Sequence, residues 1–423
     1  MSESRSEPDK IFLCRSCGTP VKTTFVDLGM SPLCESFIAG DSVDAMEPYY
    51  PLHALVCDEC FLVQLKEYVS PDDIFREYAY FSSYSSSWVE HARSYANTIA
   101  KRLSLGSGSL VVELASNDGY LLQHFLPLDI PCLGIEPAIN VAKVAIDKGI
   151  PTITEFFGVA LARKLVAQGR SADLVIGNNV LAQVPDLNDF VAGIAIVLKP
   201  EGVATLEFPH LERLIEENQF DTIYHEHFSY FSFTTVQILA LRHGLKVVDV
   251  EQLPTHGGSL RVHLARKTSK RVATKAVEAL QSHETSTGFS DIGFYTGFGE
   301  KVRRTKRGIL RCLSDIKDAG GRICGYGAPG KGNTLLNYCG IGTDFLDFTV
   351  DRNPYKHGRY TPGMHIPIFP VEKIDALKPD YVFILPWNLK AEIMHQMSHI
   401  ADWGGKFIVP IPSPQIIDPK DVH

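Results

Sequence analysis

Short apolar runs separated by helix-like segments are the feature of this sequence that most constrains its fold. In the middle of the chain, four such runs cover residues 110–114, 132–136, 172–180 and 203–208. A helix-like stretch begins at Tyr120 after the first run, and a turn over residues 199–202 precedes the last. Strands that alternate with helices predict a parallel sheet with helices on both faces.

A second series of the same kind lies near the C-terminus. Its four apolar runs are residues 322–328, 348–353, 380–388 and 406–412. Residues 268–318, between the two series, are charged and largely helical in pattern, and apolar residues also recur at helical spacing over residues 88–105. The chain is therefore predicted to be an α/β protein with two sheets.

The size and charge of the chain exclude several classes of protein. At 423 residues it is too long for one ordinary hydrophobic core, so two or three domains are expected. Its net charge of −8 provides no basic field to attract nucleic acid or an anionic membrane. Residues 1–10 lack the apolar core of a signal peptide, and no apolar run is long enough to span a bilayer. We therefore expect a cytoplasmic protein without a nucleic-acid or membrane partner, and nothing in the pattern requires more than a monomer.

Four of the nine cysteines form two C-x-x-C pairs, Cys14 with Cys17 and Cys57 with Cys60. In a reducing cytosol, paired thiols favour a metal site over a disulfide. Two such pairs complete a tetrahedral S4 zinc site, and because all four ligands come from the protein, the zinc is expected to be structural. The long stretch between the pairs should contain strands of its own. A redox dithiol or accidental spacing is the alternative.

The first apolar run ends in the turn ELASNDGYLL, residues 113–122. A small turn with a glycine lets a ligand approach the backbone at the carboxyl edge of the sheet. A pyrophosphate-binding turn would carry three glycines, whereas this turn has one glycine and an acid, Asp118, that repels anions. A cationic ligand fits better, and S-adenosylmethionine carries a positive amine and a sulfonium.

The residues expected to bind this cofactor lie at the ends of three predicted strands. They are Glu113, Ser116, Asn117, Asp118, Gly119, Glu136, Asn178 and Asn179. Glu136 ends the second run, where it can accept both ribose hydroxyls of an adenosine. Because NAD sites share this pairing of turn and acid, the pattern by itself indicates only an adenosine cofactor. A helix N-cap at Asn117 or Asp118 is the purely structural interpretation.

The run YHEHFSYF, residues 224–231, is unusually dense in groups that handle protons. Methyl transfer to carbon needs a carbanion equivalent, and beside a ketone one base can generate an enolate. Histidine has a suitable pKa for that task near neutrality, a neighbouring carboxylate such as Glu226 can orient it, and tyrosine hydroxyls can stabilise the enolate oxygen. A metal site using His225 and His227, or a packed histidine cluster, is the alternative.

The glycine-containing segment 325–333 follows a predicted strand of the second series. Its backbone N–H groups, together with Lys331 and Asn333, can hold a diphosphate, and Arg261, Arg352 and Lys356 can add positive charge. The alternative is that these glycines only permit tight packing. A dehydrogenase using this second α/β domain would bind NAD, and a non-catalytic zinc-domain protein would bind neither cofactor.

Together, these motifs resemble the three-domain S-adenosylmethionine-dependent sugar C-methyltransferases, which modify TDP-linked keto-deoxysugars. The resemblance covers nearly the whole chain and is specific through the order of its motifs. They are the two C-x-x-C pairs, FREYAYFSSYS at Phe75, SNDGYLL at Ser116, NNVLAQVPD at Asn178, YHEHFSYFS at Tyr224, THGGSLRV at Thr255, GYGAPGKGNTLLNY at Gly325, VDRNPYKHGRYTPG at Val350 and LPWN at Leu385.

The resemblance implies a zinc-binding domain over residues 1–85, a Rossmann-like class I methyltransferase domain over residues 86–250, and a Rossmann-like substrate-binding domain over residues 251–423. It also implies that His227 is the base, deprotonating the carbon beside a 4-keto group before the enolate attacks the methyl. Tyr224 and Glu226 match supporting positions. A further tyrosine is expected in this pocket, with Tyr78 as first choice and Tyr80 as second.

One residue departs from the family pattern. Gln183 stands where the family usually has a histidine, and glutamine can hydrogen-bond to a substrate but cannot shuttle a proton. This departure speaks against a mechanism with two histidines. It also leaves open a GDP-linked sugar or a non-sugar ketone as acceptor, with an NAD-dependent oxidoreductase as the more distant alternative.

Overall fold

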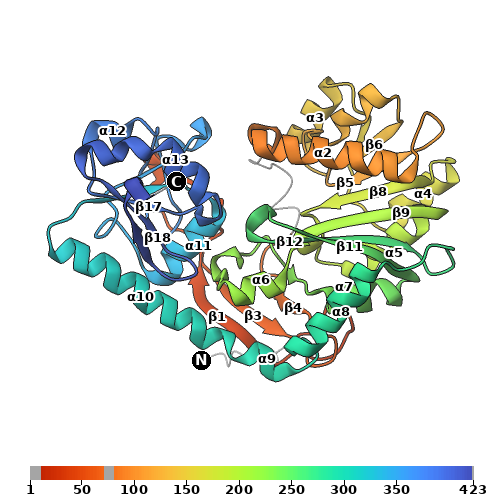
Figure 1. The fold of residues 1–423 in the computed structure, drawn as a ribbon, viewed down its shortest axis with the longest axis horizontal. Helices are drawn as coiled ribbons and strands as arrows, with labels where there is room; N and C mark the ends of the chain where they lie inside the picture. Colours follow the sequence, from red (N-terminus) through yellow and green to blue (C-terminus); the bar gives the residue numbers. More distant parts are fainter. Residues whose placement is uncertain (1–10, 71–80, 422–423) are drawn as a thin grey trace, which may run out of the picture. The chain divides into compact units, whose positions relative to one another are not determined.

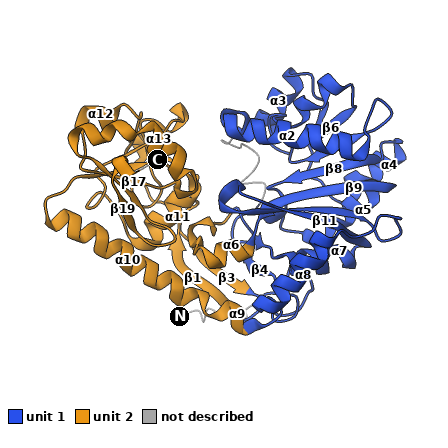
Figure 2. Cartoon of the chain, in the orientation of Figure 1, with its two compact units in different colours: residues 1–22, 56–210, 226–292 blue, residues 23–55, 211–225, 293–423 orange. Residues whose placement is uncertain are grey.

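The computed structural model describes residues 11–70 and 81–421 and divides into two compact units (Figure 2). Unit 1 contains residues 1–22, 56–210 and 226–292, and unit 2 contains residues 23–55, 211–225 and 293–423. Each unit is thus assembled from segments that are distant in sequence. Tyr78 and Tyr80 lie outside the described residues. In the two described stretches, no helix is both long and apolar enough to cross a membrane.

A seven-stranded sheet forms the centre of unit 1, in the order β11-β12-β9-β8-β5-β6-β7 (Figure 1). The strands from β9 to β7 run parallel, whereas β12 and β11 are antiparallel. The strands are β5 (Val111–Leu114), β6 (Cys132–Ile135), β7 (Thr152–Ile153), β8 (Ala172–Asn178), β9 (Leu198–Pro209), β11 (Leu245–Leu253) and β12 (Ser259–Arg266). The prediction of parallel strands at the four central apolar runs is confirmed.

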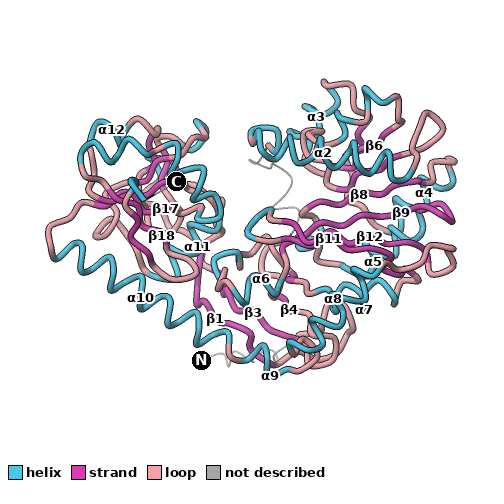
Figure 3. The backbone as a smooth tube through the Cα atoms, in the orientation of Figure 1, coloured by secondary structure: helices cyan, strands magenta, loops and turns pink. Residues whose placement is uncertain are grey.

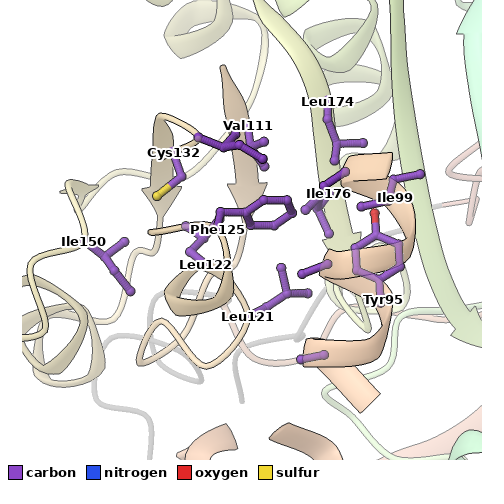
Figure 4. Close-up of a cluster of buried hydrophobic side chains, with 14 of the residues drawn as sticks. Tyr95, Ile99, Val111, Leu121, Leu122, Phe125, Cys132, Ile150, Leu174 and Ile176 are labelled. Atoms are coloured by element: carbon purple, nitrogen blue, oxygen red, sulfur yellow. The ribbon is translucent and has the colours of Figure 1, made fainter. Parts of the chain in front are cut away.

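Helix α2 (Ser86–Leu103) packs on one face of this sheet. It begins where the Ser85 side chain accepts the Trp88 N–H, which is a typical N-cap. Its apolar face meets side chains of β5 and β8, as Figure 4 shows for Tyr95 and Ile99 beside Leu174 and Ile176. Burial of this cluster fixes the turn after β5, because Leu121, Leu122 and Phe125 belong to it.

The other helices of unit 1 complete its α/β architecture. They are α3 (Ile139–Asp147), α4 (Val159–Ala167), α5 (Leu187–Val197), α7 (Phe233–Arg242) and α8 (Lys275–Thr287). Helices α7 and α8 pack on β11 at the antiparallel end of the sheet. Strands β4 (Val63–Leu65) and β10 (Ser229–Tyr230), which pair antiparallel, also belong to unit 1.

Two local expectations were wrong. The helix expected from Tyr120 is replaced by two 3-10 turns, Leu122–His124 and Leu126–Leu128, because Pro127 has no N–H to continue a helix and Asp129 is left-handed. The turn expected over residues 199–202 lies within β9. There it forms an insertion in the ladder, since Ala172 is opposite Leu198 but Leu174 is opposite Val203.

Unit 2 contains a six-stranded sheet in the order β16-β14-β13-β17-β18-β19. Figure 3 labels two of its strands, β17 and β18. Neighbouring strands are parallel except for β18 and β19. The strands are β13 (Ile323–Tyr326), β14 (Thr349–Val350), β16 (Ile368–Phe369), β17 (Tyr381–Ile384), β18 (Lys406–Val409) and β19 (Gln415–Ile417). All four apolar runs predicted for this region form strands.

The helices of unit 2 include the long α10 (Phe298–Asp318), whose apolar stripe is buried. With α8, it confirms that residues 268–318 are largely helical. The shorter helices are α6 (Leu211–Glu216), α11 (Gly330–Cys339), α12 (Lys373–Leu377) and α13 (Lys390–Gln396). The stretch between the cysteine pairs contributes β1 (Thr23–Ser31), β2 (Ile38–Ala39) and β3 (Tyr50–Val56), which confirms the strands expected there.

Candidate cofactor and catalytic site

The predicted cofactor residues meet at one edge of the unit 1 sheet. Parallel register places Leu114 beside Ile135 and Asn178 beside Glu207, so the polar residues that end β5, β6, β8 and β9 share this carboxyl edge. Open α/β sheets bind ligands at such an edge. The structure therefore brings together the three strand ends that sequence reasoning selected.

The turn after β5 has a strained backbone that its neighbours hold in place. Ala115, Asn117 and Gly119 all have positive φ, at 53°, 49° and 77°. Non-glycine residues in this region cost energy and cluster at ligand sites. Gly134 of β6 allows the turn to fold close over the sheet, since a Cβ there would lie 2.5 Å from the Ser116 Oγ. The backbone is thus shaped for close approach by a ligand.

Polar atoms at this edge are buried without partners. Among the described residues, no hydrogen-bond partner is present for Glu113 Oε2, Ser116 Oγ, Asp118 Oδ1, Asn179 Oδ1 and both side-chain atoms of Asn178. Because a buried orphan polar atom costs about 1–3 kcal/mol, such a concentration indicates a ligand site. Most of these atoms are acceptors, so the ligand should bring donors or positive charge.

Acidic groups dominate the electrostatics of the same edge. Burial, followed by the charges of Glu136 and Asp118, raises the pKa of Glu113 well above its ordinary value. Burial also raises the pKa of Glu136, although the N–H groups of Asn117 and Ala138 oppose the shift by donating to its carboxylate, each at 2.9 Å. A cation bound here would relieve the repulsion among the three acids.

This set of buried acceptors fits S-adenosylmethionine. Its amine and sulfonium are positive, and the orphan oxygens of Glu113, Asp118 and the two asparagines can accept from the amine. Glu136 is fixed by two backbone N–H groups and retains lone pairs for ribose hydroxyls. A dinucleotide pyrophosphate would instead face an acidic edge.

Sequence reasoning missed a second group of side chains at this edge. Trp88 of α2 stacks on His91 at 4.9 Å between ring centroids and meets the His256 ring edge-on at the same distance. Asn179 Nδ2 lies 3.0 Å from the His256 Nε2, and His256 has a left-handed backbone with φ of 54°. The signal for His256 was the motif THGG, but its place beside Asn179 depends on pairing between β11 and β12.

Sequence reasoning also missed Glu207. This residue lies near the end of β9, much as Glu136 lies directly after the end of β6. Its carboxylate is fully buried and accepts from Arg261 Nη2 at 2.6 Å and from Thr255 Oγ1 at 3.0 Å, with His91 Nε2 at 3.1 Å. Arg261 was expected to bind a substrate phosphate. The structure places its guanidinium in this buried ion pair and over the Tyr95 ring.

The string of residues 224–231 follows a 3-10 turn and precedes β10. His225 is buried, its Nε2 donates to the Pro51 carbonyl at 3.2 Å, and its ring meets Tyr50 edge-on. Burial lowers the pKa of His225, and its contacts with the backbone of Pro51 and Tyr50 oppose the shift. His227 is only partly buried and lies 6.3 Å from the Tyr230 ring, measured between ring centroids. The first histidine is thus built into the structure, whereas the second retains an accessible surface.

Three other predicted site residues are divided between the two units. Gln183 is partly buried in a 3-10 turn, Leu181–Gln183, directly after Asn178 and Asn179. Of the remaining string residues, Glu226 is buried and belongs to unit 1, whereas Tyr224 is partly buried and belongs to unit 2. The division between the units thus falls between His225 and Glu226.

In unit 2, a carboxylate of the protein itself, that of Glu35, contacts the glycine-containing segment 325–333. Glu35 accepts the N–H of Gly330 at the start of α11 and lies 3.6 Å from the Lys356 Nζ. Burial raises the pKa of Glu35, with Asp351 adding to the shift and Lys356 opposing it. A helix N-terminus with a lysine is the kind of place where a phosphate binds, and here a carboxylate takes that position.

The other predicted substrate residues have partners in unit 2. Lys331 Nζ donates to Asn388 Oδ1 at 2.8 Å and lies over the Trp387 ring, and Asn333 Nδ2 donates to the Cys34 carbonyl at 2.6 Å. Arg352 is exposed and pairs with Glu392 at 3.3 Å. Of these side chains, Arg352 is the one whose cation faces solvent.

The four predicted zinc ligands form one cluster. The sulfur of Cys14 lies 3.5 Å from that of Cys60, the sulfur of Cys17 lies 3.4 Å from that of Cys57, and all four lie within 4.8 Å of one another. Tetrahedral zinc with Zn–S bonds of about 2.3 Å requires sulfurs roughly 3.8 Å apart, so the cluster fits zinc. The buried Gln64 amide donates to the Cys14 sulfur at 3.2 Å and orients it.

Comparisons with known proteins follow the same order along the chain. Residues 14–75 match a zinc binding domain, residues 88–250 match a methyltransferase domain, and residues 254–412 match the C-terminal domain of C-methyltransferases. C-methyltransferase NovU of Streptomyces niveus is 35% identical over 404 residues, which are 96% of each chain.

Solved structures give partial overlaps. Magnesium protoporphyrin IX methyltransferase from Synechocystis PCC 6803 with bound SAH is 14% identical, with a TM-score of 0.34 over 42% of this chain and 82% of that one. The PH0226 protein from Pyrococcus horikoshii OT3 is 16% identical, with a TM-score of 0.36 over 46% of this chain and 97% of that one.

Proposed function

This chain belongs to the family of three-domain S-adenosylmethionine-dependent C-methyltransferases, and from that premise we propose that its acceptor is a nucleotide-linked 4-keto-deoxysugar, most simply a TDP-sugar. One observation carries the proposed chemistry. Of the two histidines in the string, His225 is buried and donates to a backbone carbonyl, whereas His227 is only partly buried. The assignment of His227 as the base therefore agrees with the geometry of both residues.

The proposed reaction removes one proton and forms one carbon–carbon bond. S-adenosylmethionine supplies a methyl group that a sulfonium makes electrophilic. His227 takes the proton from the carbon beside the ketone, and the C–H electron pair becomes that of an enolate. The enolate carbon then bonds to the methyl as its bond to sulfur breaks. We assign Glu226 to orient the base, and Tyr224 or a tyrosine such as Tyr78 or Tyr80 to donate to the enolate oxygen.

The cofactor residues have separate roles in this proposal. The orphan acceptors of Glu113, Asp118 and Asn178 hold the amine, and Glu136 holds the ribose. Ser116, Asn117, Gly119 and Asn179 shape the edge against which the cofactor lies. Trp88 packs over Tyr120 in the same unit, with 6.0 Å between their ring centroids.

We propose that unit 2 binds the nucleotide at the start of α11 through Lys356, whose Nζ donates to the Ala328 carbonyl, and that the exposed Arg352 adds positive charge. Binding of a diphosphate there requires the Glu35 carboxylate to leave the Gly330 N–H and the Lys356 ammonium. Lys331 and Asn333 hold the helix in place through their hydrogen bonds to Asn388 and to the Cys34 carbonyl. We keep Gln183 as a hydrogen-bonding contact to the sugar and propose no proton transfer through it.

The acceptor is identified by incubating the enzyme with S-adenosylmethionine and a panel of TDP- and GDP-linked 4-keto-deoxysugars and non-sugar ketones. Mass spectrometry should find a product 14 mass units heavier, about the mass of one CH2, for a TDP-sugar, and NMR should place the new methyl on carbon. Methylation of only the GDP-sugars or the non-sugar ketones would replace the proposed substrate class.

A further inference from the structure

The segment that leads into the catalytic string is fixed by a buried carboxylate. Asp221 lies in the 3-10 turn η6 (Phe220–Thr222) and is fully buried. The indole N–H of Trp387, in the turn η9 (Trp387–Leu389), donates to Asp221 Oδ2 at 2.7 Å. Both residues belong to unit 2. A buried hydrogen bond is costly to leave unmade, so this one can hold η6 against η9.

The partly buried ammonium of Lys331 offsets the charge of Asp221. Lys331 Nζ lies 4.9 Å from the centroid of the Trp387 ring, and its electrostatic attraction opposes the effect of burial on the Asp221 pKa. Burial nevertheless raises that pKa to about 7. The opposite shift occurs in Lys331, where burial lowers the pKa and Asp221 opposes it.

Other groups face Asp221 from α11. Cys339 has its pKa raised to about 12, first by burial and then, despite Lys306, by the charge of Asp221. The neighbouring Phe220 packs edge-on against Tyr338, with 5.4 Å between ring centroids. Lys331 and the Trp387 indole, with the backbone N–H groups of Asp221 and Thr222, thus lower the pKa of this carboxyl, while Cys339 feels its charge.

The far end of the same segment is fixed as well. His225 donates to the Pro51 carbonyl at 3.2 Å and packs against Tyr50, and Ile223 between the two anchors is fully buried. Residues 221–225 are therefore held at both ends within unit 2. The proposed base, His227, follows two residues later in the chain.

We propose that Asp221 and Trp387 form a clamp that positions Tyr224 and the following His227 for proton abstraction. This inference rests on the proposed function, because it assigns the clamp to the same base. Asp221 is a positioning residue here and takes no proton from the substrate. Its loss should reduce the fraction of time the base spends in a productive geometry, which lowers kcat while cofactor binding in unit 1 is unchanged.

The test is Trp387→Phe, which removes the indole N–H donor and leaves an aromatic ring at this position. Trp403→Phe is the matched control, because the Trp403 indole also donates within unit 2, to the Pro379 carbonyl at 3.0 Å. Hydrogen exchange of peptides covering residues 220–227 should be faster in Trp387→Phe and unchanged in Trp403→Phe. In the same comparison, kcat should fall about ten- to a hundredfold, with KM and S-adenosylmethionine affinity within about twofold.

Two variants of Asp221 distinguish the effect of its negative charge from that of its hydrogen-bond acceptor. Asp221→Asn keeps an acceptor for the indole, whereas Asp221→Ala removes it, so kcat should fall further in Asp221→Ala than in Asp221→Asn. Unchanged exchange over residues 220–227 in Trp387→Phe would overturn the clamp, as would faster exchange with an unchanged kcat. If the unmodified enzyme methylates none of the nucleotide sugars, the proposed substrate fails, and the exchange measurement alone decides the clamp.

Discussion

At the scale of single residues, the carboxyl of Glu113 is the group whose charge the cofactor should change most. Its pKa in the cofactor-free protein is raised, first by burial and then by Glu136 and Asp118. A cation bound beside it stabilises the carboxylate and lowers that pKa, so binding should release a proton. The affinity for S-adenosylmethionine is therefore expected to rise with pH until Glu113 is ionised in the free enzyme.

Calorimetry in two buffers of different ionisation enthalpy measures this proton release directly. Glu113→Gln should abolish the release and flatten the pH dependence of the affinity. The exposed Glu372→Gln serves as the control and should keep both. Equal proton release in Glu113→Gln and the unmodified enzyme would contradict the assignment of Glu113.

Gly119 tests the shape of the cofactor turn. It has φ of 77°, and a Cβ there would lie 2.4 Å from the Ile150 Cδ1 and 3.2 Å from the Ala145 Cβ. Gly149 has φ of 84° with nothing within 4 Å of an added Cβ, so Gly149→Ala has the conformational cost alone. Gly119→Ala should lower the free energy of unfolding by about 1–3 kcal/mol more and weaken cofactor binding at least tenfold. Equal unfolding and binding in the two variants would show that the close packing has no such role.

At the scale of elements, the two cysteine pairs form matching knuckles. Each ends in a left-handed residue, Gly18 with φ of 76° and Phe61 with φ of 59°, whose N–H donates to the carbonyl of the first cysteine. This turn directs both thiolates of a pair to one side. The fold of these segments should therefore depend on the metal that joins them.

Cys57→Ser tests that dependence. The variant should lose the zinc, and amides in residues 11–22 and 56–65 should lose protection from hydrogen exchange, because structural zinc supplies about 10–16 kcal/mol of binding free energy in small domains. Cys312→Ser, a partly buried cysteine outside the cluster, should keep one zinc per chain. A zinc-free Cys57→Ser protein with normal amide protection would disprove the structural role.

Helix α11 offers a test of the proposed nucleotide site. The Glu35 carboxylate accepts the Gly330 N–H and lies 3.6 Å from the Lys356 Nζ. It should therefore compete with a diphosphate for these two groups. Glu35→Gln removes the negative charge and should lower the KM for the nucleotide sugar several-fold while leaving cofactor affinity unchanged. A higher KM in Glu35→Gln, measured beside the exposed Glu372→Gln, would place the diphosphate elsewhere.

Elements were predictable where the local pattern was strong. The apolar runs at residues 110–114 and 172–180 became central parallel strands because such strands are buried on both faces. The helix expected after Tyr120 failed because Pro127 and the packing of Phe125 favour 3-10 turns. The insertion over residues 199–202 depends on its register against β8, which the local sequence does not contain.

The site was predictable in part for the same reason. Glu113, Glu136 and Asn178 end strands, and parallel register brings such ends together. His91 and His256 reach this edge only through the packing of α2 and the β11–β12 pair, so their positions in sequence do not place them there. The hydrogen bond from the Gly330 N–H, at the start of α11, to Glu35 likewise joins residues almost 300 positions apart.

At the scale of the whole molecule, the chain combines three family regions in two compact units. The seven-stranded sheet includes β12, which follows residue 250, so the packing boundary of unit 1 lies beyond the methyltransferase region. We keep the division at residues 85 and 250 as a proposal about the three domains. The proposed catalytic string occurs where the chain leaves unit 2 for unit 1.

The most direct measurement of the central claim is deuterium incorporation at the carbon beside the ketone. A TDP-4-keto-deoxysugar is incubated in deuterated water with the enzyme and S-adenosylhomocysteine, and NMR follows the loss of that C–H signal. The unmodified enzyme and the exposed-histidine control His395→Asn should exchange this proton, whereas His227→Asn should exchange it at least about a hundredfold more slowly with unchanged cofactor affinity. Exchange by His227→Asn at the rate of the unmodified enzyme would contradict the assignment of His227 as the base.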